Sequence, residues 1–444
     1  MPKIIENVGC PYCGCVCDDV RVTISDDGKK ILDVENACAI GYEIFKHANS
    51  DERVVLPRLR QPDGSMKTIS YDEAIDWTAR HLITAKKPLM YGFGSTNCEA
   101  HASAARVMDL AGGMLDNCAT ICHGPSFLAV FDNGYPSCTL GEVKNRADVI
   151  VYWGSNPVHA HPRHMSRYST FPAGFFTGRG QSERTIIVID PRATDTAKNA
   201  DYHLKIKQGH DYELFNAFRM IVLGYGNDLP DEVAGIKKQT ILLIADIMMK
   251  AKFGTVFFGM GLTHTDGRNH NVDNAISLVR DLNTYAKWSI MAMRGHYNIA
   301  GAGVVWSWTF GFPYCLDLTK HHYAHMNPGE TSTIDMTVRD EVDMFINIGT
   351  DAAAHFPIDA VQHLKKHPWI TIDPNITMSS EIADLHIPVC TCGVDTGGIV
   401  YRMDNVPIQF RKVIEPSEGL LDDETLLIRI ADRMEILRKE GNDP

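Results

Sequence analysis

Short runs of β-branched and aromatic residues alternate along the chain with segments whose apolar side chains recur every three or four positions. The first pattern is typical of buried strands and the second of amphipathic helices, so the alternation predicts an α/β fold. One helix start is defined in detail, because Ser70 and Glu73 have the spacing of a capping box. The predicted helix carries one apolar face, made of Ala74, Ile75, Thr78 and Leu82.

Two of the predicted strands end at a pair of glycines. Segment 89–94 ends in Gly92 and Gly94, and segment 256–261 ends in Gly259 and Gly261. Neither segment carries the third glycine of a nicotinamide-dinucleotide fingerprint. Taken singly, each glycine pair therefore predicts no more than a tight turn.

An internal repeat gives these turns more weight. Segment 149–156 (VIVYWGSN) has a counterpart at 344–351 (MFINIGTD), and 187–191 (IVIDP) has one at 370–374 (ITIDP). Four further positions keep the same offset: Thr194 with Thr377, Ala200 with Ala383, Asp201 with Asp384, and His203 with His386. An offset shared at so many positions predicts two similar open α/β units in one chain.

Open α/β units bind ligands beyond the carboxyl ends of their strands, where turn glycines let phosphates approach backbone N–H groups. Two units therefore predict two nucleotide moieties; the alternative is a duplicated fold with one dead site. For Asp190 and Asp373 the alternative is an Asx-turn or a helix cap, and the repetition of both favours a nucleotide contact. The candidate cofactor-binding residues are Gly92, Gly94, Gly154, Asn156, Asp190, Arg192, Gly259, Gly261, Gly349, Asp351 and Asp373.

Composition narrows the class of protein. The 444 residues are 44% apolar and 22% charged, which is typical of a globular protein, and the length suggests about three domains. A net charge of −12 argues against nucleic acid or an anionic membrane as partner. The start of the chain lacks the basic and apolar regions of a secretory signal, and the uncharged stretch 295–316 is too polar and glycine-rich to span a lipid bilayer. We therefore expect a cytoplasmic protein without membrane insertion.

Cysteines supply the clearest chemistry. Of the 12 cysteines, Cys10, Cys13, Cys17 and Cys38 have the spacing C-x2-C-x3-C-x20-C, with Cys15 as an extra thiol of open role. In a reducing compartment such thiols bind soft metals rather than form disulfides. Zinc is the alternative, but zinc sites usually pair two CxxC knuckles, whereas three close cysteines and one distant cysteine favour a 4Fe-4S cluster.

Two further segments carry reactive side chains. Cys122 precedes His-Gly-Pro on a predicted turn, where its thiolate could bind a metal or attack a substrate. Arg294 precedes the uncharged stretch, and an arginine there could hold a carboxylate through two parallel hydrogen bonds. The remaining cysteines are expected to be inert core thiols: Cys98, Cys118, Cys138, Cys315, Cys390 and Cys392. Two histidine groups are expected to be solvated or hydrogen-bonded: His159, His161 and His164, and His321, His322 and His325.

In combination, these motifs resemble the large subunits of molybdenum and tungsten bis(pterin guanine dinucleotide) oxidoreductases. Cys122, His123 and Arg294 are similar to the metal-ligand cysteine, adjacent histidine and substrate arginine of formate dehydrogenases. Segments 7–19 and 121–125 resemble more closely the B subunits of formylmethanofuran dehydrogenases. The resemblance covers essentially the whole chain.

The resemblance implies three domains. These are a cluster domain (1–57, joined by about 390–415), a pterin-dinucleotide domain (58–118 with 299–444) and a second such domain (119–298). Formate dehydrogenases continue into a C-terminal β-barrel, which is missing here and is a separate subunit in formylmethanofuran dehydrogenases. The implied partners are that β-barrel subunit, an amidohydrolase-like subunit and a polyferredoxin.

The implied cofactors are a 4Fe-4S cluster, two pterin guanine dinucleotides, and tungsten or molybdenum with a terminal sulfide. The resemblance makes Cys122 the protein ligand of that metal, gives His123 a part in proton transfer or ligand geometry, and lets Arg294 orient a carboxylate. It implies reversible reduction of CO2 to formate, which a partner subunit condenses with methanofuran. The alternatives are a formate dehydrogenase acting on free formate and a non-catalytic iron–sulfur scaffold.

One position departs from the formate dehydrogenase pattern. Those enzymes carry a lysine between cluster and pterin, two residues after the fourth cluster cysteine, where this chain has Ile40. Lys46 or a direct contact would have to replace that lysine. The choice between molybdenum and tungsten, and the stoichiometry of the complex, stay open at this stage.

Overall fold

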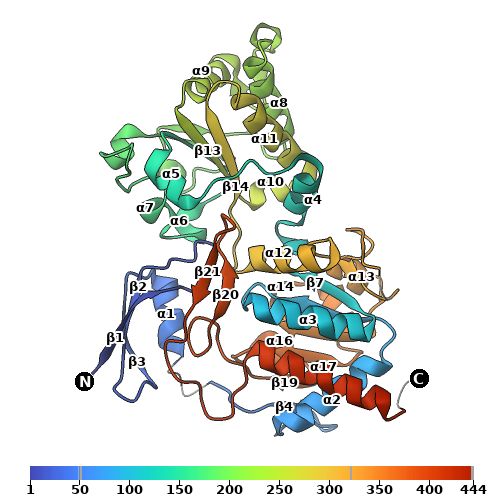
Figure 1. The fold of residues 1–444 in the computed structure, drawn as a ribbon. Coiled ribbons are helices and arrows are strands. Elements are labelled where there is room, and N and C mark those ends of the chain that lie inside the picture. Colours follow the sequence, from blue (N-terminus) through green and yellow to red (C-terminus); the bar gives the residue numbers. More distant parts are fainter. Residues whose placement is uncertain (49, 51–52, 321–322, 442–444) are drawn as a thin grey trace.

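The computed structural model describes residues 1–441 apart from 49, 51–52 and 321–322, and it confirms the predicted α/β class. Figure 1 shows a small sheet at the N-terminus, a five-stranded sheet with its helices at the top, and a nine-stranded sheet with its helices at the lower right. The chain passes from the lower α/β unit to the upper one and returns.

The N-terminal sheet is antiparallel, and a hairpin from late in the sequence packs against the loop that follows its first strand. Its elements are β1 (Lys3–Val8), β2 (Val20–Ile24), β3 (Ile31–Glu35) and the following α1 (Ala39–His47). The hairpin consists of β20 (Gly398–Tyr401) and β21 (Pro407–Phe410). A Cβ on Gly9 would lie 2.3 Å from the Phe410 ring, so this glycine permits the close contact between the two segments.

The five-stranded sheet is entirely parallel, in the order β10-β9-β8-β13-β14. Its strands are β8 (Val149–Trp153), β9 (Thr185–Ile189), β10 (Tyr202–Leu204), β13 (Phe253–Phe258) and β14 (Lys287–Ala292). A small hairpin, β11 (Glu232–Val233) and β12 (Ile236–Lys237), lies outside it. The helices of this unit are α4 (Gly124–Asn133), α5 (Leu140–Arg146), α6 (Pro157–Ala160), α7 (His164–Arg167), α8 (Asp211–Val222), α9 (Lys238–Met249), α10 (Met260–Thr263) and α11 (Arg268–Leu282).

The nine-stranded sheet has the order β16-β15-β7-β6-β17-β18-β19-β4-β5, with a parallel centre and antiparallel edges. Its strands are β4 (Arg58–Arg60), β5 (Met66–Thr68), β6 (Pro88–Gly92), β7 (Met114–Asn117), β15 (Leu316–Asp317), β16 (His325–Met326), β17 (Met344–Ile348), β18 (Trp369–Ile372) and β19 (Leu385–Ile387). The helices are α2 (Tyr71–Thr84), α3 (Cys98–Ala111), α12 (Ile299–Phe310), α13 (Thr333–Val338), α14 (Ala352–His355), α15 (Ile358–Leu364), α16 (Met378–Ile382) and α17 (Asp423–Lys439).

The parallel strands of the two sheets follow the same spatial order, because β10-β9-β8-β13-β14 matches β19-β18-β17-β6-β7. Chain order differs: β6 and β7 precede the upper unit in sequence, whereas β17 to β19 follow it. In both sheets the direction of strand order reverses at one point, between β8 and β13 or between β17 and β6. Ligands of open α/β sheets bind at such reversal points, which here lie beside the two glycine pairs.

Local sequence signals are reproduced in detail. The Ser70 hydroxyl accepts a hydrogen bond from the Glu73 N–H, and the Glu73 carboxylate accepts one from the Ser70 N–H at 2.8 Å, so the capping box opens α2 as predicted. The uncharged stretch 295–316 folds mainly as α12, whose first two turns are buried. Among the described helices, none is long and apolar enough to cross a membrane.

Candidate active site

A cavity of about 650 Å³ lies at the carboxyl ends of the five-stranded sheet. Six of the predicted cofactor-binding residues line it: Gly154, Asn156, Asp190, Arg192, Gly259 and Gly261. Its wall continues to His161, Met293 and Gly295, which lie next to Arg294. The sequence-predicted residues of this unit therefore converge on one space large enough for a nucleotide-sized ligand.

The turn glycines have a packing role that the sequence pattern did not reveal. Gly154 has a φ of +56°, and a Cβ there would lie 2.8 Å from the Cα of Gly261. Its counterpart Gly349 has a φ of +55°, with the Ser95 carbonyl oxygen 3.3 Å from the position of a Cβ. Both positions require the left-handed region that favours glycine, and Gly154 also allows two strand ends to touch.

The matched aspartates form the Asx-turns that were the alternative explanation for them. Asp190 accepts a hydrogen bond from the Arg192 N–H at 2.8 Å, and Asp373 accepts one from the Asn375 N–H at 2.9 Å. Each turn uses one carboxylate oxygen, Oδ1. A nucleotide contact by the other oxygen stays a prediction.

The other repeated positions also make matching hydrogen bonds. His203 and His386 each bond, through Nε2, the carbonyl oxygen of the aspartate 13 residues earlier, at 3.0 and 2.9 Å. Asp201 accepts from the Ile186 N–H and Asp384 from the Trp369 N–H, at 2.8 and 2.9 Å. These positions tie the strands of each unit together rather than face a ligand.

A further matched pair was missed by sequence reasoning. Thr196 donates to the Asn156 amide oxygen at 2.6 Å, and Ser379 donates to the Asp351 carboxylate at 2.7 Å. Asp351 also accepts the N–H groups of Met378 and Ser379. The offset of the repeat could have found this pair, but the change from threonine to serine hides it.

Cys122 lies on a sharp turn between a 3-10 segment, Cys118–Ile121, and α4. The Thr263 hydroxyl donates to the Cys122 carbonyl oxygen at 2.8 Å and so ties this turn to α10, at the end of β13. Burial raises the pKa of the Cys122 thiol to about 12, against the opposing effects of Arg294 and the Gly295 N–H. A metal ion would supply the positive charge that the thiolate needs here.

His123 is fully buried beside Cys122. Its Nδ1 bonds the Ser126 hydroxyl at 3.0 Å, whereas its Nε2 is buried without a hydrogen-bond partner. Burial, with a smaller effect of Arg294, lowers the pKa of His123 to about 3. The ring is therefore neutral at physiological pH. Ser126, which fixes the ring, gave no signal in the sequence.

Arg294 is a buried cation at the end of β14. Its guanidinium lies over the Phe127 ring, 5.0 Å from the centroid, and its Nε has no hydrogen-bond partner. Within the described part of the chain, no carboxylate forms an ion pair with it. Burial lowers the pKa of Arg294, and Tyr135 and Cys122 oppose that shift. A buried arginine without a carboxylate partner is suited to an anionic ligand.

The four predicted cluster cysteines surround a small cavity in the N-terminal domain, together with Tyr12 and Arg163. Cys10, Cys13 and Cys17 are buried and Cys38 is half-buried. The N–H of Gly41 donates to the Cys38 sulfur at 3.4 Å, and a Cβ on Gly41 would lie 2.9 Å from the Cys10 sulfur. Glycine at this position therefore leaves room for the sulfurs.

The sulfurs are spaced too widely for one small ion. Among the described residues, the only three or more ligand atoms that all lie within 4.8 Å of one another belong to a different group, far from these cysteines in sequence. Tetrahedral zinc with bonds of about 2.3 Å holds its sulfurs roughly 3.8 Å apart. The cysteine spacing in this structure thus does not match a tetrahedral zinc site, and the 4Fe-4S cluster stays a prediction.

The cluster loop contacts the Arg294 segment directly. Gly14 donates its N–H to the Gly295 carbonyl oxygen at 3.1 Å, and Cys13 pairs with His296 in an isolated antiparallel bridge. Lys46 was one candidate for the missing lysine bridge. Its ammonium group donates to the Leu32 carbonyl oxygen at 3.0 Å, on the exposed side of β3. This placement argues against a role for Lys46, and what replaces the lysine stays open.

The remaining thiols and histidines mostly have structural roles. Cys98, Cys118, Cys315, Cys390 and Cys392 are buried, and Cys138 is half-buried against Ser289. His159 bonds Asp195, whereas His161 and His164 are buried rather than solvated. The His161 Nε2 bonds the Arg294 carbonyl oxygen at 2.8 Å. His325 lies 3.7 Å from Glu330, and His321 and His322 lie outside the described residues.

Residues 53–419 match the molybdopterin oxidoreductase family. The chain belongs to this family. It is 48% identical over 96% of its length to the B subunit of the tungsten-containing formylmethanofuran dehydrogenase 2 of Methanocaldococcus jannaschii, 98% of which is covered. The corresponding protein of Methanococcus maripaludis is 45% identical over 97% of this chain and 100% of its own length. Within the molybdopterin oxidoreductases, this chain therefore groups with formylmethanofuran dehydrogenase B subunits.

Solved structures share the fold at low sequence identity. Acetylene hydratase from Pelobacter acetylenicus has a TM-score of 0.75 at 14% identity, covering 98% of this chain and 70% of that one. A chain of the formyltransferase/hydrolase complex from Methylorubrum extorquens has a TM-score of 0.68 at 18% identity, covering 87% of this molybdopterin oxidoreductase and 99% of that chain.

Proposed function

We propose that this chain is the catalytic subunit of a formylmethanofuran dehydrogenase and reduces CO2 reversibly to formate. The convergence of Cys122, His123 and Arg294 beside a nucleotide-sized cavity is the observation that carries the proposal. The names of the two relatives at 48% and 45% identity favour tungsten over molybdenum.

When bound, the metal and its two pterin guanine dinucleotides would supply two-electron redox chemistry. The residues present fit them: the cavity would take one dinucleotide, and Cys122 would offer a sulfur ligand on a turn held by Thr263. The reversal point of the nine-stranded sheet, with Gly92, Gly94 and Gly349, would take the other dinucleotide.

Arg294 would hold the carboxylate. CO2 takes up two electrons and one proton to become formate, so negative charge develops on its oxygens. A guanidinium that is already desolvated and has no carboxylate partner stabilises that charge more strongly than an exposed arginine would. The Phe127 ring beneath it limits the directions in which it can move.

His123 would act as a neutral hydrogen-bonding group. The bond of Nδ1 to Ser126 fixes the ring, and among the described residues its Nε2 makes no hydrogen bond. With its pKa lowered to about 3, it orients a neighbouring group or passes a proton without storing charge.

The cysteines of the N-terminal domain would hold a 4Fe-4S cluster that receives electrons singly. The contact of Gly14 with Gly295 gives a short backbone route between that cluster and the Arg294 segment. Burial raises the pKa of the Cys17 thiol to about 11, and the nearby Arg163 opposes this shift. Arg163 would therefore favour the added negative charge of a reduced cluster.

The chain would work within a complex. A β-barrel subunit would cover the pterins, a polyferredoxin would supply electrons, and an amidohydrolase-like subunit would condense formate with methanofuran. The structural similarity to a chain of a formyltransferase/hydrolase complex is consistent with such an assembly.

Replacement of the metal ligand tests the proposal. Cys122→Ser should abolish formylmethanofuran-forming activity, by more than about 10³-fold, and lower bound tungsten, because an alcohol is a poor ligand for a soft site. Cys138→Ser is the matched control, since Cys138 is also half-buried and its sulfur lies 3.0 Å from the Ser289 hydroxyl oxygen. Full activity in the Cys122 variant would refute the ligand assignment, and formate turnover without methanofuran dependence would favour a formate dehydrogenase.

A further inference from the structure

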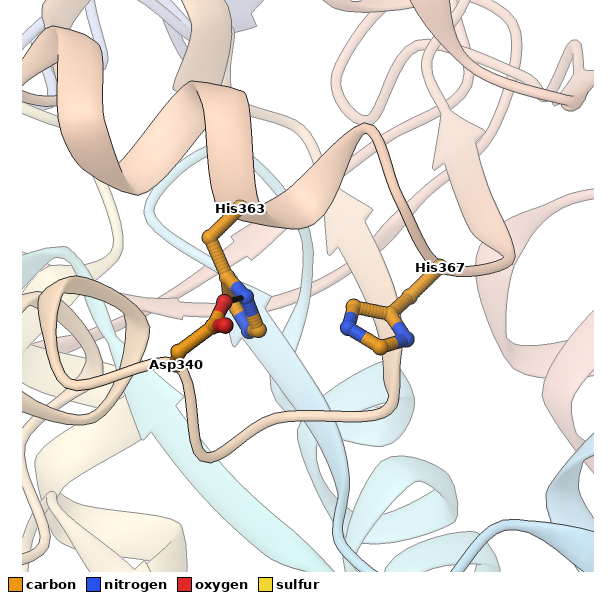
Figure 2. A group of neighbouring side chains, drawn as sticks. All are labelled: Asp340, His363 and His367. Carbon is orange, nitrogen blue, oxygen red and sulfur yellow. Dashed lines mark ion pairs between the residues drawn. The ribbon is translucent and has the colours of Figure 1, made fainter.

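Asp340, His363 and His367 form a second group of potential metal ligands, away from the candidate active site. One ligand atom from each lies within 4.8 Å of the other two. Figure 2 shows the His363 ring descending from a helix onto the Asp340 carboxylate, with the His367 ring at the same level from the following turn. His363 is buried, His367 is half-buried and Asp340 is exposed.

The group lies at the amino ends of two neighbouring parallel strands. Asp340 is in the turn between α13 and β17, and His367 immediately precedes Pro368 and β18. The reversal point with Gly349 and Asp373 is at the carboxyl ends of the same strands. The group is therefore on the opposite edge of the sheet from the proposed nucleotide site.

The hydrogen bonding of His363 leaves one nitrogen facing a carboxylate. Its Nε2 donates to the Val342 carbonyl oxygen at 2.8 Å, so in the neutral ring the Nδ1 carries only a lone pair. That Nδ1 is buried, has no hydrogen-bond donor, and contacts the Asp340 carboxylate. A metal cation between these two atoms would satisfy both of them.

We propose that Asp340, His363 and His367 bind a divalent transition-metal ion of the zinc class. Two imidazoles and one carboxylate suit Zn²⁺ and not Mg²⁺, which prefers oxygen ligands. Zinc holds such atoms roughly 3.4 Å apart, so a small movement of the exposed Asp340 completes the site. Asp340 has a φ of +62°, a left-handed conformation that a bound metal would help to hold.

The backbone hydrogen bond of His363 is typical of zinc ligands, whose second nitrogen is commonly held by a carbonyl group. The Lys366 ammonium lies 3.5 Å from Asp340, but its side chain is 62% exposed, so it can turn into solvent when the metal binds. The ion would join the turn before β17 to the end of α15 and so hold the two strand starts together.

Zinc uptake by the complete complex tests this proposal. The anaerobic complex, treated with a chelator, would be dialysed against Zn²⁺ with excess Mg²⁺, and the metal per chain measured. Wild-type complex should bind about one zinc more per chain than His367→Ala or Asp340→Asn complexes. His270→Ala is the matched control, because His270 is exposed and 3.5 Å from Asp273 but belongs to no such group.

A second readout is thermal unfolding. Zinc should raise the unfolding temperature of the wild-type and His270→Ala complexes and leave that of the His367→Ala and Asp340→Asn complexes unchanged. Equal zinc content in wild-type and variant complexes, or an equal effect of zinc on their unfolding, would overturn the proposal and leave His363 and Asp340 as an ion pair. Neither readout depends on the proposed activity, so failure here would not bear on it.

Discussion

At the reversal point of the five-stranded sheet, Gly154 packs against Gly261, and a cavity of about 650 Å³ opens beside them. At the matching point of the nine-stranded sheet, Gly349 has the same backbone conformation but looser surroundings. The hydrogen bonds of the matched Asp, His and Thr/Ser residues are the same in both sheets. The two sheets thus distinguish residues that build the scaffold from residues that shape a ligand site.

The matched pair Asn156 and Asp351 shows the same difference between a residue that lines a cavity and one that supports the fold. The Asn156 side chain accepts one described hydrogen bond and lines the cavity, whereas the Asp351 side chain accepts three and anchors the first turn of α16. A carboxylate at this position therefore stabilises a helix start in one unit, and an amide adds no further charge to the cavity wall in the other.

Replacing the turn glycines should produce the largest contrast between the two sheets. Gly154→Ala should lower the free energy of unfolding by about 3 kcal/mol or more, since a left-handed conformation costs about 1–2 kcal/mol and the new Cβ meets backbone. Gly349→Ala should cost only about 1–2 kcal/mol. Thermal unfolding of the two variants provides the measurement. Equal losses would show that close packing at Gly154 is unimportant.

A smaller contrast is expected at the Asn/Asp pair. Asp351→Ala should destabilise the protein by about 2 kcal/mol because three hydrogen bonds to the start of α16 are lost, and Asn156→Ala by about 1 kcal/mol or less. Asn156→Ala should instead weaken retention of the pterin nucleotide, measured as acid-released GMP. If Asp351→Ala loses GMP without loss of stability, its carboxylate is a ligand contact rather than a cap.

A further contrast concerns pH. Burial raises the pKa of Asp373 to about 7, so the folded protein keeps a proton that the unfolded chain releases near pH 4. Its contribution to stability is therefore present at low pH and is lost as the pH rises from about 4 to about 7. In Asp373→Asn, the unfolding temperature should fall less steeply across this window, by the linkage of about one proton.

Asp190→Asn is the matched control for the pH experiment, because its Asx-turn is the same. Burial also raises the pKa of Asp423 to about 7. Part of the pH dependence of the unfolding temperature should therefore remain in the Asp373 variant. An unchanged slope in Asp373→Asn would contradict the burial of an uncharged Asp373.

The sequence was sufficient to predict the α/β class, the capping box at Ser70 and the strands of the repeat, because these follow local hydrogen bonds and burial. It also brought Cys122, His123 and Arg294 into one hypothesis. The discontinuous chain order came only from the family resemblance, and the contact of Gly14 with Gly295 could not be predicted, because it depends on packing between distant segments.

Electrostatics was the least predictable feature. A histidine ordinarily has a pKa near 6.5, yet burial lowers the pKa of His123 to about 3. Similarly, Lys46 was a candidate bridge by its position in the chain, and α1 directs it toward Leu32. Spacing in sequence indicates which residue types are near one another but not how much water surrounds them.

The most direct test is the metal and nucleotide content of the anaerobically purified complex. We expect about one tungsten or molybdenum and about two GMP per chain, with iron for at least one cubane. Iron without tungsten, molybdenum or GMP would contradict the proposed function. The chain would then be an electron-transfer scaffold, and the roles proposed for Cys122, His123 and Arg294 would be wrong.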